Sequence, residues 1–505
     1  MNGAEQEKGR LAGLFDRARQ RTTEYAFAQA LGLLGKASEE NYARLAGVLE
    51  QAAGNDESKK MVAQWIRQYV SPGHAGAGWV KHLLTSVDPN VRRRFVARFL
   101  TNVVFSQGAG SFTTPDGKDV NVPDVIVFSP TMRCNLGCIG CYAGKYTKED
   151  DLTPDELRRI MHDAHDLGTR FFVFSGGEPL MYEALFDIFE EFDDCVFQFY
   201  TSGHLMTPEK AKRIVKLGNV VPAVSVEGFQ EETDARRGAG GFERVVKCFQ
   251  MLREAGALFA FSATGTRRNI DTITSDRFAE WLVEQGAHYG FFFSYMPIGR
   301  NPDLNLMPTP EERNRLRMAA SRFRNNYPIL VADFWNDGAI TEGCLSGARH
   351  YIHINNKGDV EPCVFAHFAV DNVRKKPLKE CLSSDFFRAL RHAAPYGKNL
   401  LRPCPIIDHP KVLRGLVKKY GAYPTHDGAE TIVTDLADFL DDYSKRLAEI
   451  YNPIWAREYC WAAKLHGKPQ YDWSQDPKWG AKLDAETEAS IVRAHEQETA
   501  DVPAG

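Results

Sequence analysis

The sequence predicts an α/β protein: a partial, TIM-like (β/α)6 barrel with a helical N-terminal region before it and a small cysteine-bearing module after it. Two observations support this fold class. Between about residues 121 and 300, short β-rich runs alternate with helical stretches, which is typical of parallel βαβ units. Before and after that zone, apolar residues recur at three- and four-residue spacings, as they do in amphipathic helices. At roughly 150 residues per domain, the 505 residues are enough for about three domains.

We divide the chain into four regions: a helical N-terminal region at 1–120, the barrel at 121–335, the cysteine-bearing module at 336–420 and a helical tail at 421–505. The barrel contains six runs with strand character, which is fewer than the eight of a closed barrel. These runs are Val125–Phe128, Phe171–Phe174, Phe197–Tyr200, Val220–Val226, Leu258–Ala263 and Gly290–Met296. Helix-start residues separate them, namely Thr153-Pro154, Thr207-Pro208 and Gly241. In this architecture the chemistry gathers where the strands end.

Composition excludes several classes of protein. Lys plus Arg number 62 and Asp plus Glu number 66, which gives a net charge of −4, so we expect no nucleic-acid partner. The N-terminal residues are charged and lack the apolar core of a secretory signal, and no run approaches the roughly 18 apolar residues of a membrane span. We therefore expect a cytoplasmic protein. Its ten cysteines are too sparse for a disulfide scaffold, and their clustering indicates metal ligation instead.

Three cysteines follow the first predicted strand directly. Cys134, Cys138 and Cys141 are spaced i, i+4, i+7 in a glycine-containing loop. Thiolates are the usual ligands of iron–sulfur clusters, and three ligands to a four-iron cluster leave one iron with an open position. Two alternatives stay open at this point: a zinc site that lacks a ligand, and buried free cysteines.

A second motif follows the second predicted strand. It is Ser175-Gly176-Gly177-Glu178-Pro179, in which two glycines permit close approach of the backbone to a ligand. The CxxxCxxC loop with an aromatic residue, Tyr142, after its last cysteine, together with this GGEP run, resembles the radical SAM family. Shorter matches support the resemblance at Ser225, which ends the fourth run, and at Arg300, just after the sixth. The family's usual Asp near the end of the fourth strand is replaced by Glu227.

The resemblance implies a mechanism and a set of roles. Cys134, Cys138 and Cys141 would bind a [4Fe–4S] cluster, and S-adenosylmethionine would chelate the open iron. One-electron cleavage would then yield methionine and a 5′-deoxyadenosyl radical that abstracts a substrate hydrogen. The implied contacts to S-adenosylmethionine are Gly176, Gly177 and Glu178 at the amino group, Tyr142 near adenine, and Ser225 and Arg300 at the methionyl or ribose end.

A second set of cysteines lies in the C-terminal module. The segment from Cys344 to Cys363 contains an apolar run, YIHI, and an Asn-Asn-Lys-Gly turn, which predicts a β-hairpin that brings the two cysteines together. This resembles the SPASM or twitch auxiliary iron–sulfur module. Cys404 would be a third ligand. Cys381 is either a fourth ligand or a core cysteine, and Asp408 or His409 is a further alternative for that position.

The substrate is the least determined feature. The first hypothesis is a radical SAM oxidoreductase or transferase acting on a peptide or small molecule, with an electron donor such as flavodoxin or ferredoxin. A second is modification of lipid alkyl chains, because Arg92, Arg93, Arg94 and Arg98 could form a basic surface for peripheral membrane contact. We favour packing of that helix on the barrel. A third is a non-catalytic iron–sulfur or zinc protein. We interpret the dense aromatics Phe291, Phe292, Phe293, Tyr295, Phe334 and Trp335 as core rather than as a substrate tunnel.

Overall fold

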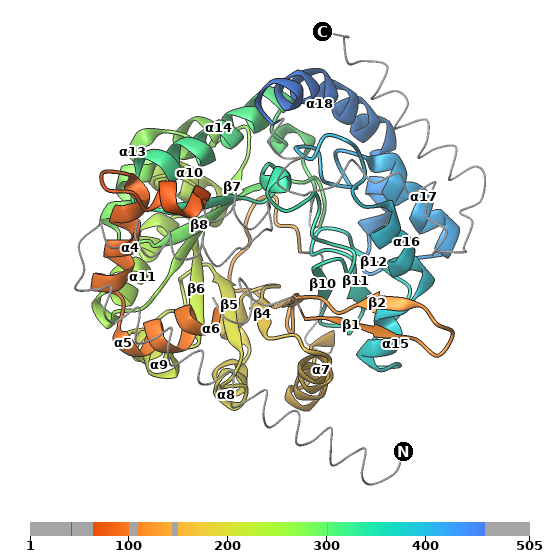
Figure 1. The fold of residues 1–505 in the computed structure, drawn as a ribbon, viewed down its shortest axis with the longest axis horizontal. Helices are drawn as coiled ribbons and strands as arrows, with labels where there is room; N and C mark the ends of the chain where they lie inside the picture. The colour runs from red at the N-terminus through yellow and green to blue at the C-terminus, as the bar shows by residue number, and fades with distance from the viewer. Residues whose placement is uncertain (1–41, 43–63, 100–108, 144–149, 300, 460–505) are drawn as a thin grey trace.

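The structure is a computed structural model that describes residues 42, 64–99, 109–143, 150–299 and 301–459 (Figure 1). Several predicted features lie outside these residues: Arg300, most of the N-terminal region before residue 64 and the part of the tail after residue 459.

The six predicted barrel strands all form. They are β3 (Val125–Phe128), β4 (Phe171–Phe174), β5 (Val196–Thr201), β6 (Val220–Ser225), β7 (Ala260–Gly265) and β8 (Tyr289–Ser294). Neighbours in this series pair in parallel, in chain order. The connecting helices cover the outer face of the curved sheet (Figure 1). They are α7 (Pro154–Leu167), α8 (Leu185–Glu191), α9 (Pro208–Leu217), α10 (Gln230–Arg237), α11 (Gly241–Ala255), α12 (Ile270–Ile273), α13 (Asp276–Glu284) and α14 (Pro310–Asn326). The partial barrel is therefore confirmed.

The sheet continues beyond the six predicted strands to nine, in the order β11-β10-β3-β4-β5-β6-β7-β8-β9. Strand β9 (Leu330–Asp333) adds in parallel to β8. At the other edge, the predicted hairpin forms from β10 (Tyr351–Ile354) and β11 (Val360–Glu361), and β10 pairs in parallel with β3, Tyr351 opposite Val125. One sheet thus spans the barrel and the cysteine-bearing module, because the fully buried β10 covers the otherwise open edge of β3.

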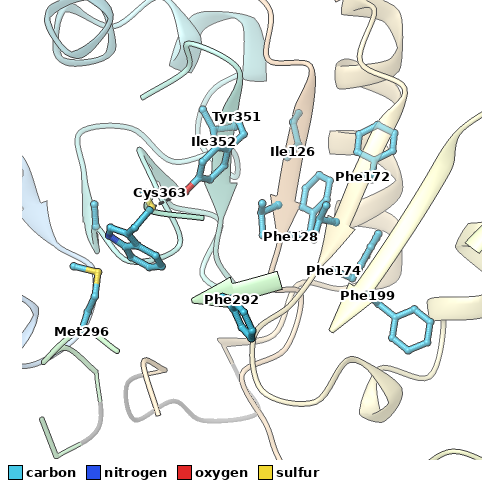
Figure 2. Close-up of a cluster of buried hydrophobic side chains, with 14 of the residues drawn as sticks. Ile126, Phe128, Phe172, Phe174, Phe199, Phe292, Met296, Tyr351, Ile352 and Cys363 are labelled. Carbon is cyan, nitrogen blue, oxygen red and sulfur yellow. Dashed lines mark hydrogen bonds between the residues drawn. The ribbon is translucent and has the colours of Figure 1, made fainter. Parts of the chain in front are cut away.

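Local signals explain where the helices begin. The Thr153 side chain accepts from the Glu156 backbone N–H while the Glu156 carboxylate accepts from Thr153, which forms a capping box at the start of α7. Thr207 caps α9, and a second capping box joins Thr309 and Glu312 at α14. Between these helices and the sheet lies a core rich in phenylalanine, in which Phe128, Phe172 and Phe174 pack together (Figure 2).

One segment predicted to be helical is a β-hairpin. Strands β1 (Ser111–Thr113) and β2 (Asp119–Asn121) pair antiparallel within the N-terminal region. Their turn is Thr114-Pro115-Asp116-Gly117, closed by a hydrogen bond from the Gly117 N–H to the Thr114 carbonyl oxygen at 2.9 Å. A Pro-Asp-Gly sequence favours such a turn, and Gly117 has the positive φ of +81° that it requires. Turn chemistry therefore outweighed the helical pattern around it.

The described part of the N-terminal region packs on the base of the barrel. It contains α4 (Ala75–Ser86), α5 (Pro89–Val91), the π-helical segment η1 (Arg92–Val96) and α6 (Ala97–Phe99). Val91 and Phe95 are buried against Val196, Val221 and Leu258, near the N-terminal ends of the barrel strands. The arginines bond to the protein itself: Arg92 donates to the Leu84 carbonyl oxygen, and Arg94 pairs with Asp193 at 3.1 Å. This geometry supports the packed-helix interpretation over a membrane-facing surface.

The C-terminal elements close the molecule beside the hairpin. Cys381 lies on α15 (Leu378–Leu382), and a second helix, α16 (Asp385–Ala393), begins where the Ser384 side chain caps it. Helices α17 (Pro410–Tyr420) and α18 (Ala437–Glu458) follow, the latter within the predicted helical tail. The remaining short elements are η4 (Pro179–Met181), η5 (Leu304–Leu306), η6 (Asp337–Ala339), β12 (Phe368–Ala369), β13 (Tyr423–Pro424) and η7 (Ala429–Val433). No helix in the described ranges is long and apolar enough to cross a membrane.

Candidate functional site

A cavity of about 310 Å³ opens at the carboxyl ends of the barrel strands. One part of its wall is polar and the other is apolar and aromatic. The polar part contains all three cysteines of the CxxxCxxC loop together with the GGE segment. The residues of the polar part are Cys134, Cys138, Cys141, Gly176, Gly177, Glu178, Ser202, Ser225, Arg236, Arg237 and Thr264. The structure therefore brings the two motifs into one cavity although about 40 residues separate them in the chain.

Backbone hydrogen bonds join the two motifs. The Gly177 N–H donates to the Thr131 carbonyl oxygen at 3.1 Å, and the Glu178 N–H donates to that of Arg133 at 2.9 Å. The contact is so close that a Cβ on Gly177 would lie 2.0 Å from the Arg133 oxygen. The GGE segment thus fixes the position of the loop residues that lead directly into Cys134.

The cysteines of the loop are chemically suited to a metal cluster. Cys134 is exposed and Cys138 and Cys141 are half-buried, so none is a core cysteine. Burial of the sulfur nevertheless raises the pKa of the Cys134 thiol to about 11, so metal binding must displace a proton there.

The spacing of the thiols argues against a single zinc ion. Within the described ranges, the only three His, Cys, Asp or Glu side chains with ligand atoms all within 4.8 Å of one another are His165, Asp194 and Cys195. Those residues lie at the opposite, N-terminal ends of β4 and β5. Zinc–thiolate bonds of about 2.3 Å would draw three thiolates to within about 4 Å of each other. The thiols of Cys134, Cys138 and Cys141 do not all lie within that 4.8 Å limit, as expected where each thiolate binds a different iron of a cluster.

Glu178 reaches the cavity but is already bonded. It is 1% exposed, and its carboxylate accepts from the Leu180 N–H, the Thr201 hydroxyl, and both the N–H and the hydroxyl of Ser202, at 2.7–3.2 Å. A carboxylate has about four acceptor positions, and these donors occupy them. The sequence predicted a free acceptor for an ammonium group. The structure shows instead a carboxylate that ties η4 to the end of β5.

Glu227, which replaces the family's usual Asp, organises two arginines at the cavity. It is fully buried and pairs with Arg236 and Arg237, each at 2.5 Å. Arg237 also lies 4.0 Å from the Cys138 sulfur through Nη1. The two guanidinium groups hold the pKa of the Glu227 carboxyl below its usual range against the effect of burial, so it stays ionised. Arg236 and Arg237 are site residues that we did not predict from the sequence. The available signal was Glu227, an acidic residue just after an apolar strand.

The other predicted contacts have different outcomes. Tyr142 lines the cavity, its hydroxyl 2.7 Å from the Ser175 hydroxyl and accepting from the Gly176 N–H at 3.2 Å. Burial raises the pKa of Tyr142 to about 12, so its phenol is neutral. Ser225 also lines the cavity, at the end of β6.

The apolar wall corrects our interpretation of the aromatic residues. Of the six that we expected in the core, Phe292, Tyr295 and Trp335 are buried there. Tyr295 also lines the cavity, and so do the other three, Phe291, Phe293 and Phe334. Alternation along β8 explains the split, because Phe291 and Phe293 face inward where Phe292 faces the surrounding helices. The barrel interior is therefore an open aromatic cavity at this level and is not filled.

The auxiliary cysteines also converge. Cys344, Cys363 and Cys404 come from three separate segments, yet the thiols of Cys344 and Cys404 interact electrostatically, as do those of Cys344 and Cys363. Burial raises the pKa of Cys363 to about 12. The Tyr351 hydroxyl lies 2.6 Å from the Cys363 sulfur (Figure 2). Because Tyr351 also lines the cavity, one side chain separates the cavity from this second set.

The structure does not add Cys381 to that set. Cys381 is fully buried on α15, which packs against α7, and its thiol donates to the Lys376 carbonyl oxygen at 4.0 Å. Among charged groups, Asp371 and Lys376 have the largest electrostatic effect on the pKa of its thiol, which burial raises. The geometry corresponds to the core-cysteine alternative. Cys195 and Cys248 are likewise fully buried, as expected of structural cysteines.

Comparison with known proteins identifies the class. The family model of the radical SAM superfamily matches residues 128–273, and that of the SPASM iron-sulfur cluster-binding domain matches residues 344–405. The chain therefore contains a radical SAM domain followed by a SPASM domain, and it is an enzyme of the radical SAM type. These domains imply a [4Fe–4S] cluster, S-adenosylmethionine and auxiliary iron–sulfur binding.

Individual relatives resemble the chain more distantly. The AdoMet-dependent heme synthase of Methanosarcina barkeri is 27% identical over 325 residues, which cover 58% of this chain and 91% of that protein. The mycofactocin maturase MftC of Mycolicibacterium smegmatis is 27% identical over 266 residues, which cover 49% and 66%. Among solved structures, Streptococcus suis SuiB bound to S-adenosylmethionine matches with a TM-score of 0.48 and 19% identity, over 56% of this chain and 72% of that one.

Proposed function

We propose that this enzyme reductively cleaves S-adenosylmethionine and abstracts hydrogen from a peptide, one apolar side chain of which enters the aromatic cavity. The observation that carries the proposal is the continuity of the cavity, which joins the CxxxCxxC loop and GGE segment to the wall formed by Phe291, Phe293 and Phe334. A reacting C–H bond placed there lies beside the cofactor site and is shielded from water.

The chain's own residues have three tasks in this proposal. Cys134, Cys138 and Cys141 bind the catalytic cluster, which together with S-adenosylmethionine supplies the radical chemistry when bound. The backbone of Gly176 and Gly177 and the side chains of Tyr142 and Ser225 position S-adenosylmethionine in the cavity, with Arg300 a further candidate. Glu178 maintains the shape of this wall through its four hydrogen bonds.

Cavity size favours a side chain over a large ring system as the buried part of the substrate. At about 310 Å³ the cavity is near the lower end of the roughly 300–1,000 Å³ of ligand pockets, and it must also admit S-adenosylmethionine. The relatives give two precedents: mycofactocin maturase, and SuiB, whose structure with the precursor peptide SuiA has been determined. The similarity to heme synthases makes a tetrapyrrole the second candidate substrate.

In the same proposal the auxiliary cluster is bound by Cys344, Cys363 and Cys404. The proposed electron donor is of the flavodoxin or ferredoxin type.

The triple variant Cys134→Ala, Cys138→Ala, Cys141→Ala tests the catalytic assignment. Without three thiolates no cluster can hold S-adenosylmethionine, so we expect formation of 5′-deoxyadenosine, with dithionite as reductant under anaerobic conditions, to fall to background. Cys195→Ser, a buried cysteine at the other end of the barrel, is the matched control and should retain cleavage. Undiminished cleavage in the triple variant would refute the assignment, and absence of cleavage in the reconstituted wild type would favour the non-catalytic alternative.

Binding to phospholipid vesicles distinguishes the lipid hypothesis from a peptide substrate. The lipid hypothesis required a free basic surface, but in the described residues Arg92 and Arg94 bond to the protein's own acceptors. We therefore expect no binding to anionic phospholipid vesicles, measured by sedimentation. Saturable binding that Arg92→Glu plus Arg94→Glu abolishes would restore that hypothesis.

A further inference from the structure

The auxiliary site has three cysteines and an unassigned fourth position. The alternatives considered from the sequence are engaged elsewhere. Both Asp408 oxygens accept from Arg313, and one of them also accepts from the Cys404 N–H at 2.9 Å. His409 Nε2 lies 2.8 Å from the Arg402 carbonyl oxygen, and Cys381 is on α15, the helix that packs against α7. Asp408, His409 and Cys381 are therefore not available to this site, and a further polar group beside the three cysteines must come from another residue.

Tyr396 has a buried hydroxyl for which the described residues offer no hydrogen-bond partner. The side chain is 3% exposed, and an unpaired polar group at such a depth costs about 1–3 kcal/mol. Its segment lies against that of Cys344: a Cβ on Gly343 would be 3.4 Å from the Pro395 Cβ. Burial raises the pKa of Tyr396, and the thiols of Cys344, Cys404 and Cys363 raise it further. The hydroxyl therefore stays protonated, and it lies within electrostatic range of all three sulfurs.

Tyr351 shows how a phenol serves this centre. Its hydroxyl lies 2.6 Å from the Cys363 sulfur, and the same three thiols act on it electrostatically (Figure 2). When Cys363 is a thiolate the phenol is the donor, because a thiolate has no proton to give. Tyr351 enters from β10 and Tyr396 from the segment after α16, so two phenols reach the centre from different elements.

We propose that Tyr396 donates a hydrogen bond to the auxiliary iron–sulfur cluster, alongside Tyr351, and that these two phenols raise its reduction potential. This inference rests on the proposed assignment of Cys344, Cys363 and Cys404. A neutral donor beside an anionic cluster stabilises the reduced, more negative state, and in a dry site the effect is strengthened. The cluster sulfurs supply the acceptor that Tyr396 otherwise lacks. Both tyrosines are positioning residues, acting on the cluster and not on the substrate.

The test is Tyr396→Phe, which removes only the hydroxyl, in the full-length reconstituted protein. We expect iron content equal to wild type and a more negative midpoint potential for the auxiliary cluster, measured by redox titration with electron paramagnetic resonance. The same titration in the Cys134→Ala, Cys138→Ala, Cys141→Ala background identifies the auxiliary signal, because that variant lacks the ligands of the catalytic cluster. Tyr351→Phe should shift the potential in the same direction. Tyr289→Phe is the control. The Tyr289 hydroxyl donates a hydrogen bond to Gln198 Oε1 at 2.8 Å, so its removal should cause no shift in the potential.

Other results would overturn the proposal. An unchanged potential in Tyr396→Phe would leave the hydroxyl without a role at the cluster, and a loss of auxiliary iron would make Tyr396 a ligand instead of a donor. If Tyr396→Phe does not fold, deuterium ENDOR of the wild-type cluster in D2O decides, because absence of an exchangeable deuteron at hydrogen-bond distance refutes the donor. Cys344→Ser plus Cys363→Ser examines the underlying assignment separately: unchanged iron content there would reject the ligand set itself.

Discussion

Arg313 is one of the largest fully buried side chains in the described residues, although it carries a charge. It is completely buried on α14, its guanidinium paired with the equally buried Asp408 and close to the Tyr451 ring. Asp408 in turn accepts from the Cys404 N–H, so this ion pair fixes the loop that carries an auxiliary cysteine. Removing one member of such a pair leaves an uncompensated charge in the core.

We therefore predict that Arg313→Met lowers the free energy of unfolding by about 3–5 kcal/mol and reduces auxiliary iron content. Thermal and denaturant unfolding measure the first effect and iron analysis the second. Arg315→Met on the same helix is the control: its pair with Asp271 is exposed, so the loss should stay under about 1 kcal/mol. Adding Asp408→Leu to Arg313→Met should restore part of the stability. A loss no larger than that of Arg315→Met would contradict the role we give to Arg313.

At the scale of elements, the GGE segment and the cysteine loop form one unit. The contact depends on the absence of a side chain at Gly177, where a Cβ would overlap the Arg133 carbonyl. The connection between β4 and η4 thus determines where the loop after β3 can lie, and through it the three thiols of the catalytic site.

Gly177→Ala should therefore displace the cysteine loop. We predict a reduced yield of the catalytic cluster and weaker binding of S-adenosylmethionine, by about tenfold or more, since the roughly 1–3 kcal/mol of overpacking falls on this loop. Isothermal titration and iron analysis are the measurements. Gly241→Ala, where the new Cβ meets nothing closer than 3.4 Å, is the control and should leave both unchanged. Wild-type affinity in Gly177→Ala would show that the loop adjusts freely.

At the scale of the whole molecule, the N-terminal helices are attached to the barrel base through His288. The Ser86 hydroxyl lies 2.9 Å from His288 Nε2, and the Trp79 indole donates to the His288 carbonyl oxygen at 2.6 Å. The His82 ring stacks on that of His288. Burial lowers the pKa of His288 to about 3, with a smaller contribution from His82.

The sign of the resulting pH dependence follows from proton uptake. Below pH 6.5 the unfolded chain protonates this histidine and the folded chain does not, so stability falls as pH decreases from 6.5 towards 3. The slope for this one group is about 1.4 kcal/mol per pH unit. We predict that His288→Gln, although less stable at pH 7.5, shows a shallower decline between pH 6.5 and 5 in denaturant unfolding. His162→Gln, an exposed histidine on α7, should follow the wild type. Parallel curves for His288→Gln and wild type would exclude a buried neutral His288.

Much of the fold could be predicted because its signals are local. Each barrel strand is a short apolar run, and a Thr-Pro cap marks the start of helices α7 and α9. The β1–β2 hairpin was missed although its Pro-Asp-Gly turn was visible, since the surrounding periodicity was given more weight. At the site, the cysteine loop and GGE segment are contiguous motifs. Arg237, Tyr351 and Tyr396 could not be predicted, because each acts through contacts with residues far away in the chain.

The sequence by itself determined the class of the protein: alternating strands and helices specify the barrel, and the spacing of Cys134, Cys138 and Cys141 specifies the chemistry of its mouth. Only the tertiary structure decided how the two cysteine sets are related. It places β10 against β3, so that Tyr351 stands between the cavity and Cys363, and it leaves Phe291 and Phe293 facing an open interior. The physical reason is that strand pairing across more than 200 residues depends on which sheet edge remains to be covered, and no local pattern records that.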